Sequence, residues 1–194
     1  KISDNYTLSV LALNNGVNDT MLNNQNAAPM TTFSQIIGQR SVYKTGKLTV
    51  GLNFYYQMGN DKSVYFDNAD NLNYHKKMSA YNVRLDLGYK INENLKAGVG
   101  FEMLSGQSQT DTTADYGQGN HAFTPLYGTN HKFNGWMDYF YVGNHINSVG
   151  LNDIFLTLDY SKNKLIAGAQ FHYFMAAADV RDMKEFNATG DIKA

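Results

Sequence analysis

The sequence predicts an all-β protein, an antiparallel transmembrane β-barrel, from three observations. Apolar and polar residues alternate along several stretches of about ten residues, as along a strand with two different faces. Short turns and long polar segments alternate between these stretches. Tyrosines gather near the ends of the stretches, where amphipathic rings favour the two membrane–water interfaces. A soluble β-sandwich or barrel is the alternative, because a half-exposed soluble sheet alternates as well.

The alternation is clearest in the segment YNVRLDLGYK from Tyr81 to Lys90. Every second residue from Tyr81 is apolar or aromatic, and the residues between them include Arg84 and Asp86. Side chains alternate between faces along a strand, so this segment has one apolar and one charged face. The same reasoning predicts seven strands, at about residues 6–13, 34–44, 48–58, 78–90, 95–104, 153–161 and 165–175.

The predicted connections differ strongly in length. Residues 44–47, 92–94 and 161–164 are tight hairpin turns. Long loops are predicted at 14–33, 59–77 and 105–152, and compact soluble domains rarely hold loops of this length. We therefore expect the apolar face to meet lipid and the charged face to line a lumen, with the long loops directed outward. After the last predicted strand, the segment AAADVRDMKEF could form a short helix or extend that strand.

The composition excludes several other classes. The chain has 194 residues, a net charge of −1 and no cysteine, which excludes a nucleic-acid footprint, a disulfide framework and cysteine-ligated metal sites. No run of about 18 apolar residues is present, so a transmembrane helix is not expected. Bacterial single-chain barrels have an even number of strands. Seven strands therefore suit a part of a larger porin-class barrel.

The predicted lumen face carries charges of both signs. With a turn near 92–93, Arg84 is expected roughly opposite Glu102, and Lys90 near Lys96. Opposite charges on facing strands would form a transverse ladder that orients dipolar solutes. The candidate lumen or constriction residues are Arg84, Asp86, Lys90, Lys96, Glu102, Asp159 and His172, with Arg40 on the same predicted face.

The predicted loop at 105–152 is unusually aromatic. It contains the only tryptophan of the chain, and a solvated loop does not normally hold so many aromatic residues. We therefore expect it to fold inward or to pack on the barrel rim. The candidate residues for such a plug are Tyr127, His131, Phe133, Trp136, Asp138 and Tyr139.

The run PLYGTNHKFNGWMDYF, from Pro125 to Phe140, resembles the alginate-export family of outer-membrane porins, in versions of the Bacteroidetes type. The resemblance is clearest from about Val83 to Tyr173. It implies a monomeric barrel of roughly 16–18 strands with a polar lumen and loops folded in as constrictions. It also implies diffusion of anionic polyuronates or other small solutes. The mixed charges of the predicted lumen face depart from a purely basic track.

The sequence gives little support for a metal site or a catalytic site. His121, His131 and His145 with Asp138 could hold a metal, but their spacing fits no compact ligand motif. The DNADN run at 67–71 lacks the glycine and the closing glutamate of a calcium loop. Nothing in the sequence places a serine beside His172. We predict no metal site, no cofactor and no enzymatic activity.

The functional prediction is an integral porin or channel of the Gram-negative outer membrane. It would pass small polar or anionic solutes, such as polyuronates or other sugar acids, by diffusion. The alternative is a structural or scaffold barrel whose folded loops bind a partner protein or a glycan. The expected partners are the lipid bilayer, lipopolysaccharide, a small polar solute and partner outer-membrane proteins, with no nucleic acid.

Overall fold

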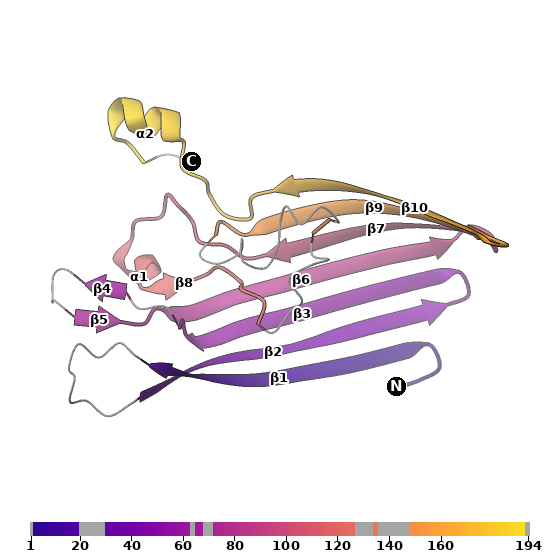
Figure 1. The fold of residues 1–194 in the computed structure, drawn as a ribbon, viewed down its shortest axis with the longest axis horizontal. Coiled ribbons are helices and arrows are strands. Elements are labelled where there is room, and N and C mark those ends of the chain that lie inside the picture. Colours follow the sequence, from indigo (N-terminus) through magenta and orange to yellow (C-terminus); the bar gives the residue numbers. More distant parts are fainter. Residues whose placement is uncertain are drawn as a thin grey trace.

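The computed structural model describes residues 2–19, 30–62, 65–67, 72–126, 134–135 and 148–192. These residues form one large twisted sheet, with the strand order β1-β2-β3-β6-β7-β9-β10 (Figure 1). All pairings along this path are antiparallel. The seven strands are β1 (Tyr6–Asp19), β2 (Met30–Thr45), β3 (Leu48–Asn60), β6 (Lys77–Lys90), β7 (Leu95–Leu104), β9 (Leu151–Lys162) and β10 (Leu165–Met175).

The sheet formed by the described residues is open. β1 lies at one edge and β10 at the other, so these strands do not close into a barrel (Figure 1). The prediction of an all-β antiparallel sheet is confirmed. The short strand β8 (Gly119–Asn120) pairs with β6 in parallel, outside the main path.

β1 and β2 extend by several residues beyond the predicted strands, and the loop prediction at 14–33 is wrong at both ends. β1 continues to Asp19 and β2 starts at Met30. The backbone pairing runs without interruption from Asn14↔Gln35 to Asp19↔Met30. Backbone ladders do not require apolar side chains, so polar residues can extend a hairpin that the apolar pattern has already ended.

The other two long segments also contain secondary structure. The predicted loop at 59–77 holds a small hairpin of β4 (Tyr65–Asp67) and β5 (Leu72–Tyr74). The predicted loop at 105–152 holds the single turn α1 (Ala114–Gly117), and then β8.

The segment that the alternation left undecided forms a helix, α2 (Met183–Thr189), and β10 ends at Met175. The Asp182 side chain caps this helix by accepting hydrogen bonds from the backbone N–H groups of Lys184 and Glu185. Gly190 ends it in the left-handed conformation, with φ of 77°. No helix among the described residues is long and apolar enough to cross a membrane.

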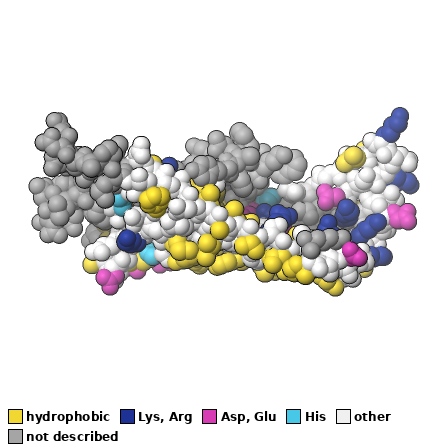
Figure 2. Space-filling model, turned by 90° about the horizontal axis from the view of Figure 1, so that it is seen from below, with side chains coloured by type: hydrophobic (Ala, Val, Ile, Leu, Met, Phe, Trp, Pro, Cys, Tyr) yellow, Lys and Arg dark blue, Asp and Glu magenta, His cyan; other side chains and the backbone are white. Residues whose placement is uncertain are grey.

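The two faces of the sheet differ in composition and in exposure. We call one the apolar face; in β3, β6 and β9 it presents residues such as Leu52, Leu85 and Leu156, which are 40%, 39% and 53% exposed. Figure 2 shows hydrophobic side chains gathered along this side of the sheet. We call the opposite side the polar face; it contains the most buried polar side chains, including Asp153 at 1% and Gln57 at 2% exposure.

The small hydrophobic core lies on the polar face. Ala80, Leu104 and Leu151 belong to neighbouring strands, and Phe123 comes from the segment that folds over them. Tyr55, Met78 and Phe174 are packed against this cluster. The polar face is therefore covered near the long-loop end, whereas the apolar face has no covering layer among the described residues.

Candidate functional site

A continuous row of polar side chains crosses the polar face from strand to strand. The register pairs Arg40 with Asn53, Asn53 with Arg84, Arg84 with Glu102, and Glu102 with Asp153. The two cations stand on β2 and β6, and the two carboxylates stand on β7 and β9. The predicted pairing of Arg84 with Glu102 is confirmed, because the β6–β7 turn lies where the sequence places it. The row therefore separates positive from negative charge across the sheet.

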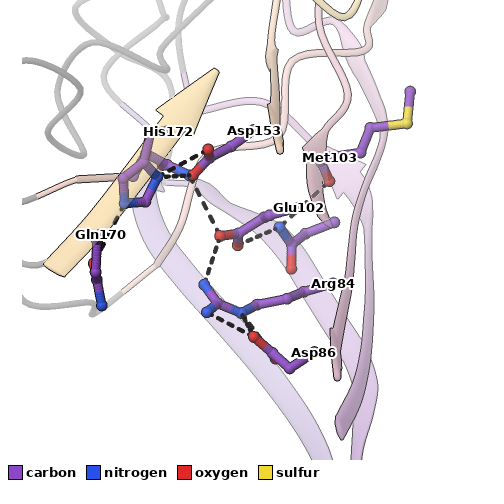
Figure 3. Close-up of polar contacts among 9 residues, drawn as sticks. Arg84, Asp86, Glu102, Met103, Asp153, Gln170 and His172 are labelled. Atoms are coloured by element: carbon purple, nitrogen blue, oxygen red, sulfur yellow. Dashed lines mark hydrogen bonds and ion pairs between the residues drawn. The ribbon is translucent and has the colours of Figure 1, made fainter. Parts of the chain in front are cut away.

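Arg84 is the centre of this row (Figure 3). Its Nε lies 3.0 Å from Oδ2 of Asp86, its Nη2 lies 2.9 Å from Oδ1 of the same carboxylate, and its Nη1 lies 3.0 Å from Oε2 of Glu102. The guanidinium carbon also stands 4.7 Å from the centre of the Phe155 ring. Charge-assisted bonds to two carboxylates fix the planar guanidinium in one orientation.

Phe155 reaches this position because the facing residue of β7 is Gly100. A Cβ atom at Gly100 would lie 2.1 Å from the Phe155 ring. The ring also stacks against His172, with centroids 5.5 Å apart. Phe155 is therefore an apolar support between Arg84 and His172, and it needs a glycine beneath it.

Glu102 also accepts hydrogen bonds from two amides. Asn82 Nδ2 donates to Oε1 at 3.0 Å, and Asn134 Nδ2 donates to Oε2 at 3.3 Å. Asn134 belongs to the connection between β7 and β9 and is only 7% exposed. This contact places Asn134 against the charged row of the polar face.

Asp153, at the end of the row, is hydrogen-bonded to His172 on β10. Nδ1 of His172 lies 2.9 and 3.0 Å from the two carboxylate oxygens of Asp153, and its Nε2 lies 3.3 Å from Oε1 of Gln170 (Figure 3). The imidazole is held between the rings of Phe155 and Phe174. His172 is among the predicted lumen residues and Asp153 is not, although the alternation of 153–161 places Asp153 on the polar face. Burial holds this pair in one geometry.

Lysines gather at the short-turn end of the polar face. Lys90 pairs with Lys96, and the Lys90 backbone N–H donates to the Lys47 carbonyl oxygen at 2.8 Å. Asp159 follows on the next strand, opposite Lys96. The predicted proximity of Lys90 and Lys96 is thus confirmed, and Lys47 is the member that sequence reasoning missed. Like charges directly opposite one another are unfavourable unless an anion or a counter-charge offsets them.

Between the Arg84 row and the lysines, the polar face is hollowed into the main cavity, of about 920 Å³. Its lining includes small residues on neighbouring strands, Thr49, Gly88, Gly98 and Thr157. It is bounded by side chains from both charged groups, Arg84, Asp86, Asp153, His172, Lys47, Lys90, Lys96 and Asp159. All of the predicted lumen residues line this cavity except Glu102, which lines a neighbouring one of about 560 Å³ together with Arg40.

The long-loop end of the polar face is closed by a segment that is held through its backbone. The Gln57 side chain donates to the Thr124 carbonyl oxygen at 2.6 Å and accepts from the Thr124 N–H at 2.8 Å. Ser105 Oγ donates to the His121 carbonyl oxygen, and Asn120 donates to the Asp61 carboxylate. These contacts place 119–126 over the polar face, on the Glu102 side of the main cavity.

The predicted plug residues Tyr127, His131, Phe133, Trp136, Asp138 and Tyr139 lie outside the described residues. Of the possible metal ligands, His121 stacks on Tyr116 with ring centroids 4.3 Å apart. His131, His145 and Asp138 are outside the described part of the chain. Within that part, no group of three His, Cys, Asp or Glu side chains could hold a metal ion.

The arrangement suits the binding and orientation of charged or dipolar solutes. Its groups are an ion-paired arginine, a histidine bonded to a buried carboxylate, and exposed lysines around an open cavity. No protein-family model, curated protein or solved structure matches the chain. The resemblance to the alginate-export porins therefore stays a prediction.

Proposed function

We propose that this sheet is part of the wall of a transmembrane β-barrel in the Gram-negative outer membrane, and that the barrel passes small polar or anionic solutes by diffusion. One observation carries the proposal: the exposed face is the apolar one, and the covered face holds the charges. Leucines of β3, β6 and β9 are about half exposed, whereas Asp153 is 1% exposed. An apolar surface that spans several strands is unfavourable in water and favourable in lipid.

The open edges are consistent with a larger barrel. In the hydrocarbon region, an unpaired strand edge would leave backbone groups without hydrogen-bond partners, so barrels close on themselves. We propose that further strands pair with β1 and β10 in the complete assembly. The seven strands described here, each with 10 to 16 residues, are long enough to cross a bilayer at a tilt.

The charges of the polar face support a solute path. Arg40 and Arg84 stand on one side of the row, and Glu102 and Asp153 stand on the other, which produces a field across the wall. At the short-turn end, Lys47, Lys90 and Lys96 line the main cavity together with Arg84 and Asp153, and their charges favour anions there. Small anionic solutes, including polyuronates or other sugar acids, are the class that such an entrance would concentrate.

A structural or scaffold barrel is the second candidate, and one observation favours it. The buried Gln57 side chain holds the segment around Thr124 on β3 through two hydrogen bonds. Asn134, from the connection between β7 and β9, donates a hydrogen bond to Glu102. A segment held this firmly over the polar face could fill the lumen and present a folded surface to lipopolysaccharide, a glycan or a partner outer-membrane protein.

Single-channel recording of the full-length protein in planar bilayers separates the two candidates. We expect a steady ohmic conductance and, under a salt gradient, a reversal potential that reflects anion preference. We call Lys47, Lys90 and Lys96 the lysine row. Lys90→Glu should shift the reversal potential toward that expected for cation preference, because it lowers the summed charge of this row from +3 to +1. The variant is compatible with folding, since the new carboxylate would stand between Lys47 and Lys96.

Lys162→Glu is the matched control. It changes the charge equally, but Lys162 follows Ser161 at the end of β9, on the opposite face from Asp159. The control should leave the reversal potential unchanged. Insertion without conductance would support the scaffold, and equal shifts in both variants would exclude the lysine row from a conduction path.

A further inference from the structure

Polar side chains interrupt the apolar face in the middle of β2. Between Tyr43 and Ile37, the two residues of β2 on this face are Ser41 and Gln39, and both are polar. The register pairs Ser41 with Leu52 and Gln39 with Phe54 on β3. Across β6 and β7, the same two rows continue with apolar residues, Leu85, Phe101, Val83 and Met103.

These polar side chains form a directed hydrogen-bond chain. Ser41 Oγ donates to Gln39 Oε1 at 2.6 Å, and the hydroxyl of Tyr6 lies 2.9 Å from Ser41 Oγ. A serine hydroxyl has only one proton, so Tyr6 must be the donor to Ser41. The chain ends at the carboxamide of Gln39. Within the described ranges, the Gln39 amide nitrogen has no hydrogen-bond partner, and the side chain is only half-buried.

An amide with unsatisfied donors is costly against lipid tails, because hydrocarbon offers no acceptor. The adjacent surface is otherwise suited to close packing: Val10, the direct neighbour of Gln39 on β1, is 75% exposed, and Ile37 is 47% exposed. Polar side chains within an apolar membrane surface frequently bond across a protein–protein contact. We therefore expect a partner protein to supply a hydrogen-bond acceptor for the Gln39 amide at this position.

A second copy of the chain supplies this acceptor. A carbonyl oxygen has two lone pairs, and Ser41 uses only one on Gln39, so the other can accept from an identical amide. Two copies related by a twofold axis beside Gln39 would form a reciprocal amide pair, rimmed by Val10 and Ile37. Such an isologous contact satisfies both copies at once.

We propose that the apolar face of β1 and β2, centred on Gln39, is a homodimer contact within the membrane. This inference rests on the proposed function, because it requires the apolar face to meet lipid. It departs from the monomeric barrel that the family resemblance implies.

The absence of cysteine from the chain permits a direct test. The full-length protein carrying Val10→Cys is reconstituted in lipid vesicles and treated with a short thiol cross-linker. We expect a cross-linked dimer. Phe171→Cys is the matched control, because Phe171 is 64% exposed on the same face but lies on β10, at the other edge of the sheet. It should remain monomeric under the same treatment.

Adding Gln39→Leu to Val10→Cys should weaken dimerisation about tenfold in a lipid-dilution series, since the two amide hydrogen bonds between the copies are lost in lipid. Cross-linking that is unaffected by Gln39→Leu, or equal at both cysteine positions, would overturn the proposal. Cross-linking of Val10→Cys in native membranes to a different protein alone would also overturn it. Protein that inserts normally as a monomer would refute the dimer and leave the proposed function standing, whereas protein that fails to insert would refute both.

Discussion

The two faces of the paired strands β3 and β6 differ in what covers them. On the apolar face, Leu52 pairs with Leu85 and both are about 40% exposed. At the adjacent position of each strand, on the polar face, Asn53 pairs with Arg84, and the Arg84 guanidinium is held by two carboxylates. A soluble half-exposed sheet does the opposite, because it covers its apolar face and exposes its polar one. This arrangement is the one expected of the barrel wall that we propose, because alternation alone does not determine which face is covered.

The largest expected effect comes from an arginine placed on each face in turn. Leu85→Arg should cost about 2–4 kcal/mol of folding free energy in lipid vesicles, because the proposed barrel places this side chain at the middle of the membrane. Gly88→Arg should cost much less, since Gly88 lines the main cavity and a Cβ there meets only Thr49 at 3.9 Å. Urea unfolding of both variants measures the difference. Equal penalties would break the assignment of the two faces.

A smaller effect tests how the polar face is covered. Gln57→Ala should cost about 1–3 kcal/mol, because it leaves the half-buried N–H and C=O groups of Thr124 without the Gln57 amide as their partner. It should also make 119–126 more sensitive to limited proteolysis. Asn53→Ala is the control on the same strand and face, and it should leave the protease sensitivity unchanged. Unchanged proteolysis in Gln57→Ala would show that this amide does not hold the segment in place.

A third prediction concerns the support of the charged row. Gly100→Ala should destabilise the protein by about 1–3 kcal/mol, because the new methyl group would lie within the Phe155 ring and force it aside. Moving Phe155 would also release Arg84 and His172 from its two sides. We therefore expect an altered reversal potential in planar bilayers together with the loss of stability. Native stability in this variant would mean that the ring has other space on the polar face.

The part of this arrangement that follows from sequence is the part fixed by local geometry. Alternation assigns Arg84 and Asp86 to one face, and the short turn at 92–94 fixes the register that places Glu102 opposite Arg84. The extension of β1 and β2 by polar residues was missed because an apolar pattern reports burial or lipid contact, whereas strand pairing is a property of the backbone.

Contacts between distant segments are not encoded in any local pattern. Gln57 and Thr124 are 67 positions apart, and neither residue type indicates the other. The pair of Asp153 and His172 is diagonal, since the direct partner of His172 is Phe155. A register predicts direct partners. The choice of a diagonal partner depends on side-chain rotamers and, here, on the Phe155 ring, which has space only because the facing residue is Gly100.

The smallest expected effect is a gain in stability, and it comes from another glycine-to-alanine substitution on the polar face. Gly88→Ala should stabilise the protein by about 0.5–1 kcal/mol, because alanine loses less backbone entropy than glycine when a strand forms. Space allows it, since a Cβ at Gly88 meets Thr49 only at ordinary contact distance. Both Gly88 and Gly100 lie on the polar face, so a difference in sign between the two alanine variants would separate the open cavity from the packed row. Urea unfolding of the two variants, measured side by side, gives that comparison. Destabilisation by Gly88→Ala as large as that by Gly100→Ala would mean that the main cavity is filled, and would remove the space that a diffusing solute requires.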